Sequence, residues 1–270
     1  MKATIKDGVV YSPYPKVDIP TCSVYNAMKE FLTKSPDKLA LGLFMVGDSA
    51  PGFTSVSDFV NKNEDDFKEV RIEDPKKTTV ALFYSSGTTG HAKGMEISHY
   101  SIVANLHLTK SLVSYEPGDV LLAWYPITYA SGFMFTPVAA CVGSNCLVVN
   151  PNLSFDEFVY YVNKYKVTTF AAGPSRLHYY VAAMLKTGTK LPSVKYINVG
   201  GTVLTQEFAK MIMVAFDGLQ SLRNVYGMSE SCGVICTPPK GDISPGNVGF
   251  PAPMVELKLG SSPYKGSGLV

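Results

Sequence analysis

The chain has 270 residues and a formal net charge of +2, with 46% apolar and 17% charged residues. This length and apolar content predict a globular chain with a sizeable core, in one large domain or two small ones. The nearly balanced charge argues against nucleic acid or a membrane surface as the main partner, since both normally bind clustered Lys and Arg. No stretch approaches the roughly 18 to 20 consecutive apolar residues of a membrane span. Because residues 1–20 also lack a signal-peptide block, an intracellular, cytoplasmic location is expected.

The cysteines are odd in number and stand in mainly apolar surroundings, which suits a reducing compartment. They are Cys22, Cys141, Cys146, Cys232 and Cys236. The close spacing within the last two pairs leaves a metal site open as an alternative. No histidine lies near either pair in the sequence, so buried or half-buried thiols are the favoured interpretation.

The first 77 residues are less regular than the rest of the chain. Tyr11 to Pro20 is rich in proline and predicted to be extended, and Ser23 to Thr33 has the apolar spacing of an amphipathic helix. From about Thr78 onward, short β-branched or aromatic runs alternate with amphipathic segments, which indicates a layered α/β architecture. The sequence thus divides into a short N-terminal segment, 1–77, and a core, 78–270.

Strands and helices alternate along this core. The predicted strands are Thr79 to Tyr84, Val120 to Tyr125, Asn145 to Val149, Thr168 to Ala172, Lys195 to Val199, Arg223 to Tyr226 and Val255 to Leu259. The predicted helices are Tyr100 to Val113, Ser154 to Tyr165, Ser175 to Lys186 and Thr205 to Phe216.

The first core strand runs directly into a loop of small and hydroxylated residues, Ser85 to Gly94, which ends with Lys93 and Gly94. Glycines let several backbone N–H groups face one anion, hydroxyls add donors, and a lysine adds a mobile positive charge. The loop is neither a GxxxxGK[ST] P-loop nor a GxGxxG fingerprint. Composition alone leaves two alternatives open, namely a phosphate-binding loop and a flexible turn that binds nothing.

The exact sequence of the loop favours a phosphate-binding loop. Tyr84 to Gly94, continuing through His99, closely resembles the signature of the adenylate-forming superfamily, which contains acyl-CoA synthetases, 4-coumarate:CoA ligases and beetle-type luciferases. Most members have proline where this chain has Ala92, and its loss makes the loop less rigid without removing a donor.

Further elements of that family follow in the expected order. Asn198 to Leu204 resembles the Gly-Gly turn on which adenine rests, and Arg223 to Glu230 resembles the Tyr-Gly-x-Thr-Glu element. The resemblance implies that Tyr226 stacks on adenine, that Ser229 touches the α-phosphate and that Glu230 holds Mg²⁺. Without the family, the first element is an ordinary strand-to-helix turn and Glu230 a solvated carboxylate.

A segment at 124–133 matches the part of the family that carries the pocket for the acid. Its pocket candidates are Tyr129, Gly132 and Phe133, and many members have histidine where Tyr129 stands. The residues that the resemblance assigns to the nucleotide are Ser85, Ser86, Gly87, Thr88, Thr89, Gly90, Lys93, Gly201, Thr202, Tyr226, Gly227 and Ser229. Those assigned to catalysis are Lys93, Ser229 and Glu230, with Glu230 as the metal ligand.

The resemblance implies an activity. ATP and a small hydrophobic carboxylic acid, of fatty acid or phenylpropanoid metabolism, form an acyl-adenylate, and the acyl group then passes to coenzyme A. The phosphates would be stabilised by Mg²⁺, Lys93 and the loop hydroxyls. A luciferase-like monooxygenase remains a minor alternative, because these motifs do not separate the two groups.

Parts of the family pattern are missing from the sequence. Only Gly42 to Lys77 separates Val10 to Leu41, which resembles the family's start, from the phosphate loop, where members have a block of strands and helices. The sequence ends before the Tyr-x-Thr-Gly-Asp element and the small lid domain with its catalytic lysine, and without a C-terminal peroxisomal signal. We therefore expect an incomplete large N-terminal domain with weak ATP binding and little turnover, or a non-catalytic nucleotide-binding or interaction protein.

Overall fold

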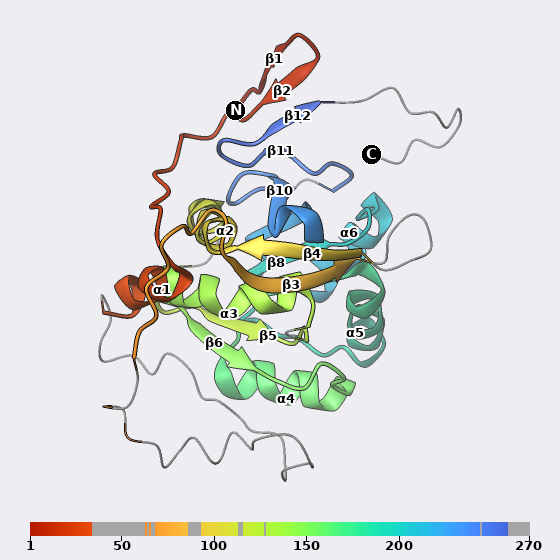
Figure 1. The fold of residues 1–270 in the computed structure, drawn as a ribbon. Helices are drawn as coiled ribbons and strands as arrows, with labels where there is room; N and C mark the ends of the chain where they lie inside the picture. The colour runs from red at the N-terminus through yellow and green to blue at the C-terminus, as the bar shows by residue number, and fades with distance from the viewer. Residues whose placement is uncertain are drawn as a thin grey trace.

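A computed structural model describes residues 1–33, 63, 65, 68–85, 93–112, 116–126, 128–243 and 245–258. Within these ranges a seven-stranded sheet forms the centre of the molecule, in the order β11-β10-β9-β8-β7-β5-β6 (Figure 1). Its strands are β5 (Val120–Ala123), β6 (Asn145–Val148), β7 (Thr169–Ala172), β8 (Tyr196–Gly200), β9 (Ser221–Met228), β10 (Gly233–Thr237) and β11 (Phe250–Pro251).

Five neighbouring strands, β9-β8-β7-β5-β6, are parallel, and β10 and β11 add an antiparallel edge. The connecting helices are α3 (Ala130–Val142), α4 (Phe155–Tyr165), α5 (Pro174–Thr187) and α6 (Gln206–Ala215). The chain moves outward from β5 to β6 through α3 and then back across the sheet to β9 through α4, α5 and α6. Since such crossovers are right-handed, α3 lies on one face of the sheet and α4 to α6 lie on the other.

The face under α4, α5 and α6 is closed by the larger apolar cluster. Trp124, Phe158, Phe170 and Tyr180 stack or meet edge to face at its centre, with ring centroids 4.4 to 6.0 Å apart. The helix α4 begins with a capping box, in which Ser154 accepts from the backbone of Glu157 while the Glu157 carboxylate accepts from Ser154. This face is therefore covered by closely packed apolar side chains.

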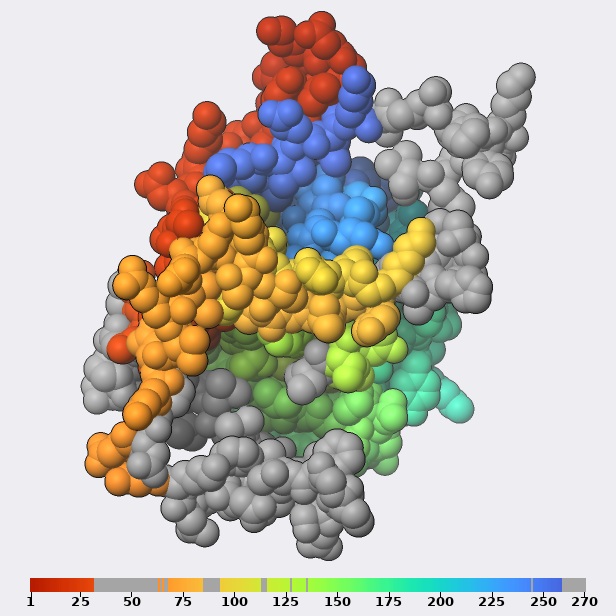
Figure 2. Space-filling view, in the orientation of Figure 1, coloured from red at the N-terminus to blue at the C-terminus, as the bar shows by residue number. Residues whose placement is uncertain are grey.

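The opposite face carries α1 (Val24–Thr33), α2 (His99–Leu112), α3 and a hairpin of β3 (Thr79–Ser85) and β4 (Lys93–Ser98). Phe31 of α1, Phe83 of β3, Leu106 of α2 and Met134 of α3 belong to one buried cluster. The hairpin lies across the front of the molecule, in orange and yellow (Figures 1 and 2). It holds Ser85 and Lys93, the ends of its two strands, on the same face as α3.

The two ends of the described chain meet in a second, smaller sheet. Strands β1 (Thr4–Lys6), β2 (Val9–Tyr11) and β12 (Glu256–Lys258) are antiparallel, with Val10 of β2 opposite Leu257 of β12. In Figure 2 the red N-terminal residues accordingly lie beside the blue C-terminal strands. Residues about 250 positions apart in the sequence are thus held together by backbone hydrogen bonds.

The α/β prediction is confirmed, and each predicted strand and helix has a counterpart whose described bounds differ by a few residues at most. Among the described residues, one helix and five strands were not predicted: the helix α3 and the strands β1, β2, β4, β10 and β11. Residues 113 and 259, where two predicted elements end, lie outside the described residues. In the part of the chain that the structure describes, no helix has both the length and the apolar character needed to cross a membrane.

Candidate functional site

The crossover pattern itself creates a crevice. The helix that follows β5 lies on one face of the sheet and the helix that follows β7 lies on the other, although the two strands are neighbours. Ligands of open α/β sheets bind outside the carboxyl ends of strands where the connections diverge in this way. The Tyr125 hydroxyl, just beyond β5, accepts a hydrogen bond from the backbone N–H of Gly173, just beyond β7.

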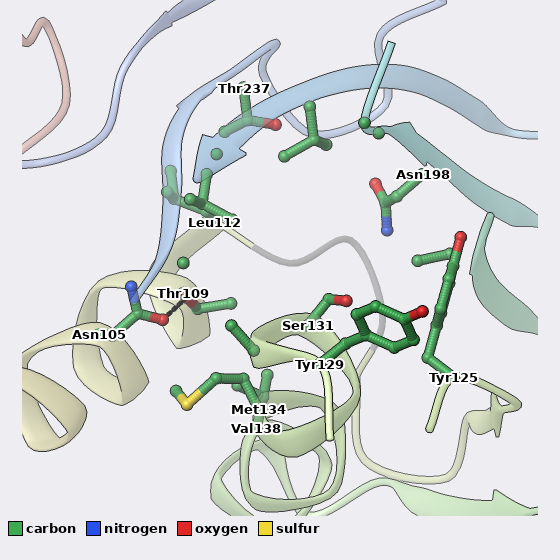
Figure 3. Close-up of a pocket in the computed structure, with 18 of the residues that line it drawn as sticks. Asn105, Thr109, Leu112, Tyr125, Tyr129, Ser131, Met134, Val138, Asn198 and Thr237 are labelled. Atoms are coloured by element: carbon green, nitrogen blue, oxygen red, sulfur yellow. Dashed lines mark hydrogen bonds between the residues drawn. The ribbon is translucent and has the colours of Figure 1, made fainter. Parts of the chain in front are cut away.

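A pocket of about 380 Å³ opens at this place (Figure 3). It is enclosed by α2, α3 and the ends of β5, β7, β8, β9 and β10. Its lining includes the side chains of Asn105, Thr109, Leu112, Tyr125, Tyr129, Ser131, Met134, Val138, Asn198 and Arg223. Most of the wall is apolar and a few polar groups converge on it, as is usual for small-molecule sites.

Two of the nucleotide motifs line this pocket. Gly200 and Gly201 contribute from the end of β8, and Gly227 and Ser229 contribute from the end of β9. Gly201 has φ +90°, a left-handed conformation that favours glycine. A side chain at Gly227 would collide with the carbonyl oxygen of Gly233 on β10, so glycine there allows the two strands to approach closely.

Other residues of these motifs lie at the rim or in solvent. Tyr226 is half-buried, and its hydroxyl lies 3.9 Å from the sulfur of Met228. Thr202 and Glu230 are exposed beside the pocket-lining Gly201 and Ser229. Their assigned contacts with adenine, phosphate and metal remain predictions.

The predicted phosphate loop connects β3 to β4. Ser85 and Lys93 are opposite each other at the ends of the two strands, and Lys93 is exposed. Ser86, Gly87, Thr88, Thr89 and Gly90, as well as the side chain of Ser85, lie outside the described residues. Strand β3 contacts the 3-10 turn η3 (Ser229–Ser231), so two motifs that are 140 residues apart in the sequence become neighbours.

The three residues predicted to line the acid pocket lie in different surroundings. Tyr129, the N-cap of α3, is 61% exposed and lines the pocket. A Cβ at Gly132 would collide with the carbonyl of Pro126, so this glycine lets α3 begin close to the preceding turn. Phe133 points into the cluster under the hairpin, where its ring lies 5.5 Å from that of Phe83, and it does not line the pocket.

Several pocket residues were not among the predicted site residues, and three of them belong to the same helix. Asn105, Thr109 and Leu112 come from one face of α2, at positions i, i+4 and i+7. This helical spacing of two polar residues with one apolar residue is the signal that would have identified them. The approach of Leu112 to β9 and of Asn105 to β10 depends on tertiary structure, because α2 stands more than 100 residues earlier in the chain.

Arg223 is a buried cation at the edge of the pocket. It is 3% exposed and donates to the carbonyl oxygen of Leu112 at 2.7 Å, to that of Pro238 at 3.3 Å and to Oδ1 of Asn198 at 3.2 Å. Leu112 is the last residue of α2, where the carbonyls lack partners within the helix and the helix dipole is negative. Arg223 therefore ties the end of α2 to the sheet.

The thiols near the site are poor nucleophiles. Burial raises the pKa of Cys232 and of Cys236 to about 11 and that of Cys141 to about 12. All five cysteines are free. Covalent catalysis through a thiolate is thus disfavoured near neutral pH.

The comparisons with known proteins agree with this geometry. The profile of the family "AMP-binding enzyme" matches residues 26–264. A protein of Dictyostelium discoideum described as a probable 4-coumarate–CoA ligase is 29% identical over 217 residues, and a luciferin 4-monooxygenase of Photuris pensylvanica is 26% identical over 218. These alignments cover 80% and 77% of this chain and 39% of each relative, so the chain spans about two fifths of their length.

Solved structures show the same fold. A long-chain-fatty-acid–CoA ligase of Archaeoglobus fulgidus superposes with a TM-score of 0.66 at 21% identity, over 75% of this chain and 42% of the ligase. The profile match covers most of the chain, and the Gly-Gly and Tyr-Gly motifs meet at one pocket in a fold that these ligases share. The chain therefore belongs to the AMP-binding enzyme family.

Proposed function

We propose that this chain is the acid- and ATP-binding core of a ligase that activates a small apolar carboxylic acid as its acyl-adenylate and then transfers the acyl group to the thiol of coenzyme A. One observation carries the proposal. Gly201 and Ser229, assigned to the nucleotide, line the same apolar pocket as Tyr129, assigned to the acid. An acid in that pocket would meet the phosphates at the carboxyl ends of β8 and β9.

The chemistry asks the protein to bring two anions together. A carboxylate oxygen attacks the α-phosphorus, a new C–O–P linkage forms, and the bond to pyrophosphate breaks so that pyrophosphate leaves with the electron pair. We propose that Ser229 donates to an α-phosphate oxygen and that Lys93 offsets charge on the departing phosphates. The apolar walls at Leu112, Met134 and Val138 exclude water from the acid.

The residues present suit Mg²⁺ bound together with nucleotide. Glu230 is an exposed carboxylate next to the pocket-lining Ser229. No cluster of three or more His, Cys, Asp or Glu occurs in the described ranges. Mg²⁺ commonly uses one or two carboxylates plus substrate phosphates, which fits Glu230 as its single protein carboxylate. When bound, the ion would neutralise phosphate charge.

Calorimetric titration with Mg·ATP tests the nucleotide site. We expect Lys93→Ala and Glu230→Ala to weaken binding about 10-fold or more, because the first removes a positive charge proposed to offset the phosphates and the second removes the carboxylate proposed to hold Mg²⁺. Lys210→Ala and Glu207→Ala on α6 are matched controls, since both residues are exposed and away from the pocket. Equal affinities in all five proteins would refute the proposed site.

Acid-dependent exchange of pyrophosphate into ATP, measured with a panel of fatty and aromatic acids, tests the first half-reaction. Exchange that requires an acid and is lost in Lys93→Ala supports a ligase. ATP binding without exchange would favour the non-catalytic alternative, and light emission or oxygen uptake on an adenylate would favour the luciferase-like one. The same assay measures the rate of the first half-reaction in these 270 residues.

A further inference from the structure

The α2 side of the pocket holds a buried amide with an unused donor. Asn105 is only 5% exposed, and its Oδ1 accepts a hydrogen bond from the Thr109 hydroxyl at 3.0 Å. Among the described residues, none accepts a hydrogen bond from its Nδ2. Figure 3 shows Asn105 and Thr109 together at the wall of α2, across the pocket from Tyr125 and Tyr129.

The backbone opposite makes room for this amide. Gly233, the first residue of β10, has no side chain, and a Cβ built there would overlap Nδ2, Oδ1 and Cγ of Asn105. Gly233 also lines the pocket. The position of the amide therefore depends on two elements, α2 and β10, and not on the rotamer of one exposed side chain.

The surroundings of the amide are apolar. Leu112, Met134 and Val138 form the neighbouring wall, and Thr109 uses its hydroxyl proton on Oδ1. A buried amide donor without a protein acceptor is costly to retain unless water or a ligand completes it. A donor fixed in an apolar wall discriminates strongly between ligands with and without an acceptor, because the mismatched ligand leaves it unpaired.

We infer that Asn105 is a specificity-determining residue that selects acids with an oxygen acceptor, such as a ketone, ether or hydroxyl oxygen, on the part of the apolar body that packs against α2. This inference rests on the proposed function, in which the pocket takes the acid. The Nδ2 group donates to that oxygen, and Thr109 fixes which edge of the amide faces the ligand. An acid with a purely hydrocarbon body would bind without this hydrogen bond.

Octanoate and its 5-, 6- and 7-oxo derivatives provide probes with nearly equal length and shape, and the ketone position that reaches Asn105 need not be known in advance. Dissociation constants are measured by calorimetry on the full 270-residue chain. We expect the best oxo acid to bind about 10-fold more tightly than octanoate, which is the effect of one hydrogen bond in a desolvated pocket.

Asn105→Leu, which has a similar shape and no donor, should reduce that ratio to about 1 and bind octanoate at least as well. Asn105→Ala, which is shorter and also has no donor, provides a second variant if the leucine protein does not fold. Met134→Leu is the control in the same pocket and should keep the ratio of the wild type.

Two results would overturn the inference. If no oxo acid is preferred, or if the preference persists in the Asn105 variants, the inference fails while octanoate binding leaves the proposed function intact. If no acid binds at all, the proposed function fails too, and the inference fails with it.

Discussion

The hydroxyl group of Tyr125 accepts a hydrogen bond from the backbone N–H of Gly173 and so joins the ends of two neighbouring parallel strands, β5 and β7. Gly173 is the N-cap of α5 and has no side chain to cap it. The Arg176 guanidinium lies 5.3 Å from the centre of the Tyr125 ring. Burial raises the pKa of the Tyr125 hydroxyl, which therefore stays protonated at neutral pH. This contact fixes the rim of the pocket where the connections after β5 and β7 diverge.

Replacing Tyr125 by phenylalanine removes the acceptor and keeps the ring. We expect the free energy of unfolding to fall by about 1 kcal/mol, because the Gly173 N–H loses its partner in a partly buried site. Urea denaturation followed by circular dichroism measures the change. Tyr179→Phe is the matched control, since Tyr179 is 55% exposed, and its loss of stability should be smaller. Equal stability of the two variants would contradict this role.

Replacing Arg223 by methionine leaves the carbonyls of Leu112 and Pro238 and the Asn198 side chain without their donor. We expect a loss of roughly 3 kcal/mol in unfolding free energy, because three acceptors lose their hydrogen bonds to a charged donor in a buried site. Arg223→Lys should recover only part of this loss, because an ammonium group lacks the planar fork. Lys210→Met, at an exposed site, should change stability by no more than about 0.5 kcal/mol.

Gly227 and Gly94 offer a comparison between two strand glycines. An alanine at Gly227 collides with the Gly233 carbonyl oxygen, whereas an alanine at Gly94 meets its nearest atom, Cε1 of Tyr84, at an ordinary 3.4 Å. We expect Gly227→Ala to destabilise the protein by about 1 to 3 kcal/mol through overpacking. Gly94→Ala should be tolerated. Calorimetry measures the melting temperature of each variant. If the β9–β10 approach were loose, Gly227→Ala would melt at the same temperature as Gly94→Ala.

His99 predicts a pH dependence. Its Nδ1 accepts a hydrogen bond from the Val24 N–H, at the start of α1, at 3.1 Å, which requires a neutral ring nitrogen. Burial lowers the pKa of His99 below its ordinary 6.5. The unfolded chain therefore takes up the proton first as the pH falls, so this contribution to stability is present above about pH 6.5 and declines below it.

The variant His99→Asn isolates this contribution, because the asparagine side chain keeps an acceptor and does not titrate. Urea midpoints are measured between pH 7.5 and 5 for both proteins. The wild type should lose more stability than the variant over this range. Parallel pH profiles would show that the bond to Val24 does not depend on the charge of His99.

Local sequence was enough to predict the elements that carry strong patterns. Strand β7 is a short apolar run, and α4 combines apolar positions at helical spacing with the Ser154–Glu157 capping box. Helix α3 was missed because Gly132 and Pro137 are poor helix formers and its residues are apolar on all sides. It forms because it is packed between the sheet and the hairpin, and because Gly143 ends it in a left-handed conformation.

Some features of the candidate site could likewise be predicted from local sequence, and others could not. Local sequence was enough to recognise the Gly-Gly turn at 200–201 and the motif at 226–230. In both, a strand end, glycines and polar side chains stand within a few residues of one another. The sequence could not place Phe133 against Phe83 or bring Asn105 to Gly233, because such pairings depend on how α3 and α2 pack on the sheet.

The contact between Tyr125 and Gly173 illustrates the same difference between what local sequence predicts and what tertiary structure decides. The sequence by itself determined the alternation of strands and helices, the family motifs and their order, because these depend on residues within a few positions of one another. Only the tertiary structure decided that β5 and β7 are neighbours with their helices on opposite faces, and that an amide of α2 enters the pocket. Strand order and helix packing are set by apolar contacts between distant segments, and no local pattern specifies those contacts.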